Sequence, residues 1–341
     1  LFRSSNRWLY TYVASTNYAD WVYSGQNGDI APGLGFTMKG TNHATQNQLY
    51  EFRGRANNGT ISNTVANGEW TLVGNPYPSA LDAVDFIHDT DNVNSITGTL
   101  YYWEQAPGAS SHNIANYVGG YATYTIASDG TGELFTPATF NTYNADGSIN
   151  TVGASSATGK AAKRYIPIGQ GFMVEGNSAV NTLVYTRNTH REYYKQSGTE
   201  SFFFREGPSA NSEANNSVED EDIIIDSYGY PVHENYMRFR LNIDINETYT
   251  RQLLMNFTNL ATDGFDYGME GKHPDVLSSD AHWIIGSEPY VIQSLAFDQT
   301  ITIPVVLKLN QQQNIQFRLF DVIRFEDSQP IYLHDIQEDL Y

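Results

Sequence analysis

Hydrophobic and polar residues alternate over several short segments of the chain, most regularly over residues 237–245. Here Met, Phe, Leu and Ile occupy every second position, and Arg, Asn and Asp lie between them. A period of two places the apolar side chains on one face of an extended segment, so the pattern predicts a β-strand. Similar aromatic and β-branched runs predict strands over residues 8–13, 99–103, 121–126, 301–309 and 314–319.

Helical patterns are scarce. The best candidate begins at Ser79, a residue type that favours helix N-caps, and continues through residues 80–87 with acidic residues in its first turns. Many short strands separated by Gly, Asn, Asp and Ser are typical of sandwiches and jelly rolls. We therefore predict an all-β protein, in which a jelly-roll-like β-sandwich domain precedes a second, smaller β-sandwich domain.

Acidic residues are concentrated in the C-terminal part of the chain. Residues 1–205 contain 15 acidic and 12 basic side chains, whereas residues 206–341 contain 23 acidic and 7 basic ones. The first residues of the acidic part have no Lys or Arg and few apolar side chains, which is typical of a solvated linker. We predict a first domain at 1–205, an acidic linker at 206–222 and a second domain at 223–341.

A weak internal repeat links residues 32–40 to residues 168–176. Both copies share a Gly-x-Gly-Phe-x-x-x-Gly frame, and an aromatic strand-like run follows each of them. Neither copy opens a helix, so the pattern lacks the context of a phosphate-binding loop. We predict instead that the glycines form bulges or bends at which the backbone needs positive φ angles.

The most distinctive stretch is the Gly-Asn-Pro-Tyr-Pro-Ser element at residues 74–79, which follows a hydrophobic run. Gly and Pro are the residues that most often mark turns, so the element predicts a corner that reverses the chain. In the alternative interpretation Asn75 and Tyr77 form part of a binding edge.

Composition excludes several classes of function. The formal net charge of −19 argues against nucleic acid or an anionic membrane surface as the partner, because both attract patches of Lys and Arg. The chain has no Cys, which excludes disulfides, thiolate catalysis and Cys-ligated metal sites. No run of about 18 apolar residues occurs, so the sequence predicts no membrane-spanning helix.

Recognisable catalytic motifs are missing from the sequence. The eight His residues form no His-Glu-x-x-His pattern, and no Gly-x-Ser-x-Gly nucleophile elbow occurs. A glycosidase needs two facing carboxylates, but among 38 acidic residues any pair could be nominated. We therefore expect a protein that is not an enzyme.

The densest acidic loop supplies candidate metal ligands. Asp263 and Asp266 belong to an Asp-Gly-x-Asp segment, and Glu270 follows them closely. Calcium prefers several carboxylate and carbonyl oxygens from one loop, so these three residues form the best calcium site that the sequence offers. The alternative is a solvated loop in which Asp and Gly form turns.

Aromatic side chains are the remaining candidates for ligand contacts. Tyr101, Trp103, Tyr121 and Tyr124 lie in a polar region rich in Gly and Asn. On an exposed sheet face such rings would stack on sugars, and amphipathic rings are favoured at interfaces in general. The alternative is that these alternating aromatic residues fill the core of a sandwich.

Several of these segments, taken together, resemble large cell-surface proteins of Bacteroidetes, of the flavobacterial type, that the type IX secretion system exports. The resemblance lies in residues 70–82, in the aromatic strands that follow, in residues 166–174, and in the segments 251–254, 261–268 and 290–293 in that order. It covers most of residues 20–335, and the Gly-Asn-Pro-Tyr-Pro-Ser element is its most specific part.

The resemblance implies a location more than an activity. Such regions precede a C-terminal sorting domain that the secretion machinery recognises, so we expect an internal or processed piece of an extracellular protein, secreted or attached to the cell surface. Its expected role is a non-catalytic structural or adhesive module, an adhesin, with surface glycans or other extracellular proteins as partners. The alternative is a carbohydrate-binding module or part of a polysaccharide-degrading enzyme.

Overall fold

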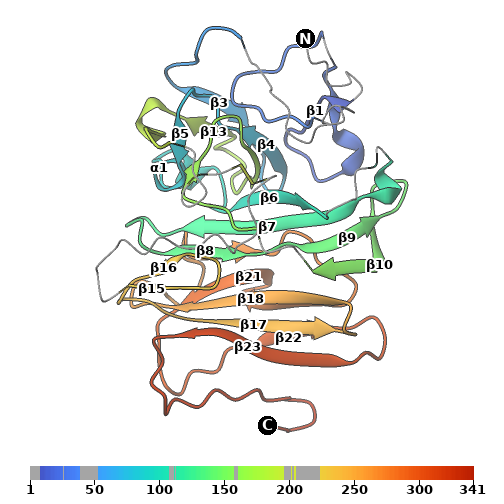
Figure 1. Ribbon diagram of the computed structural model, residues 1–341, viewed down its shortest axis with the longest axis vertical. Coiled ribbons are helices and arrows are strands. Elements are labelled where there is room, and N and C mark those ends of the chain that lie inside the picture. The colour runs from blue at the N-terminus through green and yellow to red at the C-terminus, as the bar shows by residue number, and fades with distance from the viewer. Residues whose placement is uncertain are drawn as a thin grey trace.

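The computed structural model describes residues 8–25, 27–38, 53–106, 111, 113–156, 160–195, 201, 203–204 and 223–341. Most of the regular structure in these residues is strand, and the single α-helix, α1 (Ala83–Ile87), is one short element among them. The predicted all-β fold is confirmed. In Figure 1 the chain forms stacked layers, with the small N-terminal sheets above, a central sheet in the middle and a second large sheet below.

The central sheet has the strand order β10-β9-β7-β6-β12-β4, and β8 also pairs with β7. All its described pairings are antiparallel. Its strands are β4 (Trp70–Gly74), β6 (Leu100–Gln105), β7 (Val118–Ile126), β8 (Glu133–Thr136), β9 (Thr139–Tyr143), β10 (Ile149–Ser156) and β12 (Gly171–Glu175).

The second large sheet has the order β22-β20-β21-β18-β17-β23, and β19 pairs with β21. Its pairings are antiparallel except that of β18 with β21, which is parallel. Its strands are β17 (Met237–Ile245), β18 (Tyr249–Phe257), β19 (Gly271–Lys272), β20 (Asp280–Ile285), β21 (Glu288–Leu295), β22 (Val305–Lys308) and β23 (Ile315–Ile323).

Four smaller sheets and four 3-10 turns complete the described structure. The small sheets pair β1 (Tyr10–Thr11) with β2 (Val22–Tyr23), β3 (Ile61–Thr64) with β13 (Leu183–Thr186), β15 (Ile224–Ile225) with β16 (Pro231–Val232), and β5 (Ala80–Asp82) with both β11 (Tyr165–Ile166) and β14 (Arg191–Glu192). The turns are η2 (Tyr18–Asp20), η3 (Asn92–Asn94), η4 (Ile114–Asn116) and η5 (Asn188–His190). No helix among the described residues is long and apolar enough to cross a membrane.

The strand predictions hold best where apolar residues alternate. β17 begins and ends at the predicted residues, whereas β1 and β22 are shorter than the predicted strands at 8–13 and 301–309. β22 begins directly after Pro304, which has no backbone N–H to donate to a neighbouring strand. The predicted helix start at Ser79 is wrong, because residues 80–82 pair with β11 and β14. Asp82 is the N-cap of α1 and accepts a 2.9 Å hydrogen bond from Val84 N.

The Gly-Asn-Pro-Tyr-Pro-Ser element forms a buried corner. Asn75 donates to the carbonyl oxygens of Ser79 and Ile166 at 2.8 and 3.2 Å and accepts from Tyr77 N at 3.0 Å. Tyr77 is also buried. Because both side chains are buried and engaged with the protein, the element reverses the chain and offers no binding edge.

The two copies of the internal repeat lie on opposite sides of β4. The first copy approaches β4 where Gly35 N donates to Leu72 O at 2.9 Å, and the second contributes β12, in which Gly171 pairs with Gly74. Gly33 and Gly169, the first glycine of each frame, have φ angles of +83° and +76°. The predicted positive φ angles are therefore confirmed at the first glycine of each frame, whereas Gly35, Gly171 and Gly176 do not have them.

Buried residues connect the two large sheets. Leu134 of β8 packs in the apolar cluster of the second sheet, and Tyr230 packs in the cluster of the central sheet. The linker predicted at 206–222 lies outside the described residues, and the division into domains at its two ends stays a prediction.

Candidate functional site

Two of the four aromatic residues predicted to stack on sugars are completely buried. Tyr101 and Tyr124 each have an exposed fraction of 0%, because β6 and β7 are covered on both faces. Burial also raises the pKa of both phenol groups well above the usual value. The sugar-stacking prediction is therefore wrong for Tyr101 and Tyr124, and the alternative that they fill the core holds for these two.

Trp103 and Tyr121 are half-buried neighbours on the same face as Tyr101. Their rings meet edge to face with centroids 5.1 Å apart, and Tyr121 also lies 5.9 Å from the ring of Trp70. Aromatic contacts of this kind stabilise a sheet face. Contact of Trp103 and Tyr121 with a sugar stays a prediction.

The three carboxylates of the predicted calcium loop have different environments. Asp263 is exposed, Asp266 is half-buried and Glu270 is completely buried. The Asp266 carboxylate accepts from the backbone N and the hydroxyl of Thr262 at 2.5 and 3.0 Å, which closes the loop. No group of three or more His, Asp or Glu in the described part of the chain is placed to hold a metal ion. Calcium binding by Asp263, Asp266 and Glu270 stays a prediction.

Glu270 accepts hydrogen bonds from backbone N–H groups. Its two carboxyl oxygens lie 2.6 Å from Asp266 N and 3.4 Å from Ser294 N. Burial raises the pKa of Glu270 to about 9, and the backbone N–H groups only partly offset this effect. The carboxyl group is therefore neutral at pH 7, and it anchors one end of the loop beneath the protein surface.

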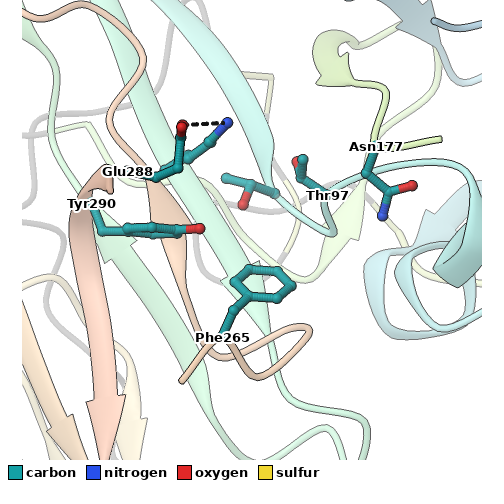
Figure 2. A pocket seen from close by; sticks show the side chains of 7 residues that line it. Thr97, Asn177, Phe265, Glu288 and Tyr290 are labelled. Atoms are coloured by element: carbon teal, nitrogen blue, oxygen red, sulfur yellow. Dashed lines mark ion pairs between the residues drawn. The ribbon is translucent and has the colours of Figure 1, made fainter. Parts of the chain in front are cut away.

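An open pocket of about 290 Å³ lies beside this loop, where the central sheet meets the second sheet (Figure 2). It combines segments that are far apart in the sequence, namely the chain before β6, the chain after β12, the loop between β18 and β19, and strands β19 and β21. We call it the Phe265 pocket. The described residues that line it are Thr97, Thr99, Asn177, Phe265, Lys272, Glu288 and Tyr290.

Two aromatic rings form one side of the Phe265 pocket. Phe265 has 44% of its surface exposed, whereas Tyr290 has 6%. Their ring centroids lie 6.2 Å apart with an interplanar angle of 40°, and Figure 2 shows both rings on the same side of the pocket. Burial raises the pKa of Tyr290 to about 12, so its hydroxyl keeps its proton at neutral pH.

The polar side of the pocket is organised around Lys272. Its Nζ atom lies 3.1 Å from Glu175 Oε1 and 3.0 Å from Glu288 Oε2. Burial lowers the pKa of Lys272, but the two carboxylates outweigh this effect and the pKa is raised, so the ammonium stays charged. The Glu175 side chain is 8% exposed and the Glu288 side chain 53% exposed. Lys272 therefore joins one buried and one solvent-facing carboxylate.

Two threonines lie at the end of the pocket that the central sheet supplies. Thr99 donates its hydroxyl hydrogen bond to the carbonyl oxygen of Glu270 at 3.2 Å, which ties the pocket to the acidic loop. The Thr97 hydroxyl oxygen is buried and has no hydrogen-bond partner in the described part of the chain. An unpartnered buried hydroxyl is costly.

This arrangement is suited to binding. Exposed aromatic surface next to hydroxyl, ammonium and carboxylate groups is the usual composition of a small-ligand site. Sequence patterns did not reveal the pocket because its residues are spread from position 97 to position 290. One local signal was present in Phe265, a lone large apolar residue inside a loop of Thr, Asp and Gly.

Comparison with known proteins identifies the family of the chain. The search of curated proteins found no match, and the search of solved structures found none either. The sequence matches one family along almost its whole length, from residue 2 to residue 341. The chain therefore belongs to the family described as "Domain of unknown function (DUF8693)".

Proposed function

We propose that this chain is a non-catalytic adhesive module of an extracellular protein, and that it binds surface glycans through the Phe265 pocket. One observation carries the proposal. A phenylalanine ring that is 44% exposed lies beside a tyrosine ring, and both face an open pocket with a polar opposite side. Exposing an apolar ring to water is unfavourable, so such a ring on a loop favours a role in ligand contact.

The size and chemistry of the pocket favour a sugar as the ligand. Its volume of about 290 Å³ lies at the lower end of the usual range for small-ligand sites, roughly 300–1,000 Å³. A pocket of this size suits one small unit of a longer chain that continues along the protein surface. Sugars present an apolar ring face to aromatic side chains and hydroxyl groups to polar ones, and the pocket offers both kinds of contact.

A binding role also fits the carboxylates near the pocket better than catalysis does. Glycosidases need one carboxyl group that donates a proton and a second that attacks or activates water. Here both Glu175 and Glu288 are ion-paired with the same ammonium group of Lys272. The lining residues also provide no pairing of a nucleophile with a base.

The proposed location rests on the sequence resemblance to surface proteins exported by the type IX secretion system. In this proposal the type IX secretion machinery exports the protein, which is then secreted or attached to the cell surface. A weakly binding pocket would support adhesion if many copies were arrayed, because linked sites gain avidity without new contacts. Other extracellular proteins remain the second class of partner within this proposal.

The proposal predicts that binding depends on Phe265. A glycan array with the wild-type chain, followed by calorimetry with the best glycan, should show that Phe265→Ala weakens binding about tenfold, since an aromatic contact of about 0.5–1.5 kcal/mol and its buried area are lost. Leu260→Ala is the matched control, because Leu260 is an exposed apolar residue of the same loop and does not line the pocket.

Two results would contradict the proposal. One is an array without signal for plant, algal or bacterial glycans. The other is a glycan that binds equally well to the wild type and to Phe265→Ala, because its binding site would then lie elsewhere on the protein.

A further inference from the structure

The charge around the Phe265 pocket restricts which sugars can enter it. Of the seven described lining residues, Lys272 is the single cation and Glu288 is the single anion. Lys272 also pairs with Glu175, so these three side chains together carry a net negative charge. The exposed Asp263 and the half-buried Asp266 flank Phe265 on its loop and add to it. An incoming anion therefore meets a negative field.

Lys272 cannot be released to pair with an anionic ligand. The Glu175 side chain is only 8% exposed, and Lys272 is its ion-pair partner at 3.1 Å. Moving the ammonium toward a ligand carboxylate would leave Glu175 charged and unpaired in a largely buried position, which is strongly unfavourable. Burial already raises the pKa of Glu175 above its usual value, which shows that its charged form is poorly solvated. The ammonium group of Lys272 is thus neutralised within the protein and is not available to an anionic ligand.

A cationic ligand, unlike an anionic one, would find groups in the pocket that can bind it. The Glu288 side chain is 53% exposed, and a carboxylate offers more acceptor positions than the contact with Lys272 occupies. The exposed face of Phe265 lies in the same pocket, and aromatic faces attract ammonium groups. An amino group on a sugar ring can therefore approach a partly free carboxylate and an aromatic face at the same time.

We infer that the Phe265 pocket selects amino sugars, accepts neutral sugars and rejects uronic acids. This inference rests on the proposed glycan-binding function and names the substrate class of the same site. Three features carry it, namely Lys272 held by the buried Glu175, the solvent-facing Glu288, and the exposed ring of Phe265.

Three probes with the same β-1,4-linked backbone test the inference. These are oligomers of glucosamine, of glucose and of glucuronic acid, titrated calorimetrically into the whole chain at mildly acidic pH, where the amino groups are protonated. The glucosamine oligomer should bind about twofold to fivefold more tightly than the glucose oligomer. The glucuronic acid oligomer should bind more weakly than both.

Variants separate the pocket from general attraction to an acidic protein. Glu288→Gln should remove the preference for glucosamine over glucose, measured as the ratio of the two dissociation constants for that one variant. Glu326→Gln removes the same charge from an exposed residue outside the pocket and should leave the preference intact. Phe265→Ala should weaken binding of both glucosamine and glucose.

The outcomes distinguish this inference from the proposed function. If the glucuronic acid oligomer binds as tightly as the glucose oligomer and Phe265→Ala abolishes both, the pocket binds glycans and the selectivity is wrong. If glucosamine binding survives Phe265→Ala, or falls equally in Glu288→Gln and Glu326→Gln, the attraction is diffuse and the inference fails. If no probe binds, the inference fails, and the glycan array decides separately whether the pocket binds any other glycan.

Discussion

Glu270 shows how a single buried residue links the acidic loop to the two large sheets. Its side chain accepts from Asp266 N and Ser294 N, and its carbonyl oxygen accepts from the Thr99 hydroxyl. The side chain that resembled a calcium ligand in the sequence thus holds the base of the loop that presents Phe265. The buried environment of the Glu270 carboxyl group should make the stability of the protein depend on pH.

The raised pKa of Glu270 predicts that the protein becomes less stable as pH rises. The folded-state pKa is about 9, against 4.5 for an ordinary Glu. Stability from the neutral carboxyl group is therefore fully present below pH 4.5 and is lost between about pH 4.5 and pH 9. Glu270→Gln, which is neutral throughout, should flatten the fall of the melting temperature over this window.

The exposed Glu326 provides the comparison for this experiment. Glu326→Gln should leave the pH dependence of the melting temperature as it is in the wild type. If Glu270→Gln and the wild type lose stability in parallel between pH 5 and pH 9, the carboxyl group of Glu270 is not neutral in the folded protein.

At the scale of elements, β4 is held between the two copies of the internal repeat. Glycine in the first copy lets the backbone approach β4 closely, since a Cβ atom on Gly35 would lie 2.7 Å from Leu72 Cγ and 2.9 Å from Val73 O. Directly after β4, the buried Asn75 fixes the corner that leads to β5 and α1. The repeat and the Gly-Asn-Pro-Tyr-Pro-Ser element therefore serve one structural purpose, the anchoring of an edge strand.

Gly35→Ala should destabilise the protein, because a contact of 2.9 Å with a backbone oxygen cannot be relieved by a side-chain rotation. We expect the free energy of unfolding to fall by about 1–3 kcal/mol, as in other overpacked sites. Gly264→Ala is the control, since a Cβ atom there has ordinary spacing of 3.7 Å to its nearest neighbour. Denaturant titration of both variants measures the difference, and equal stabilities would show that the close approach is not needed.

At the scale of the whole molecule, buried charges join the two large sheets. Arg238 and Arg240 of β17 are completely buried, and both bind Asp226 Oδ2, at 2.9 and 2.8 Å. They also donate to the carbonyl oxygens of Glu133 and Phe135 in β8, at 2.9 and 2.6 Å. Although burial opposes it, the two guanidinium groups hold the pKa of Asp226 below its usual value. From these contacts we expect the two sheets to fold as one unit.

Arg240→Ala should therefore lower the stability of both sheets together. Removing one partner of a buried ion pair leaves Asp226 poorly compensated, and we expect a loss of about 3–5 kcal/mol in the free energy of unfolding. Because the sheets share buried contacts, wild type and variant should each unfold in one transition. Tryptophan fluorescence and circular dichroism during denaturant titration measure both quantities.

Arg318→Ala is the matched control for this prediction. Arg318 pairs with Asp244 on the surface and its side chain is 47% exposed, so its loss should cost no more than about 1 kcal/mol. Two separate transitions in the wild type, or equal losses in the two variants, would contradict the coupling of the sheets through Arg240.

Local patterns in the sequence determined the secondary-structure class and several individual strands. The alternation over residues 237–245 predicted β17 correctly. Successive side chains of a strand point to opposite faces, so alternating apolar and polar residues indicate an extended segment. The repeat likewise predicted the positive φ angles of Gly33 and Gly169, since few residues other than Gly tolerate positive φ angles. Such features depend on the residue and its neighbours in the chain.

Burial and the assembly of the pocket depended on contacts between distant segments. Large apolar and aromatic residues lie on both faces of β6 over residues 100–103, so its sequence alone could not reveal that Tyr101 is covered. Phe265, in contrast, is 44% exposed on its loop. The helix begins at Ala83, with Asp82 and not Ser79 as its N-cap, because residues 80–82 pair with strands more than 80 positions later. The Phe265 pocket joins positions 97 to 290 for the same reason: exposure and proximity are set by what packs against a residue, which local sequence does not encode.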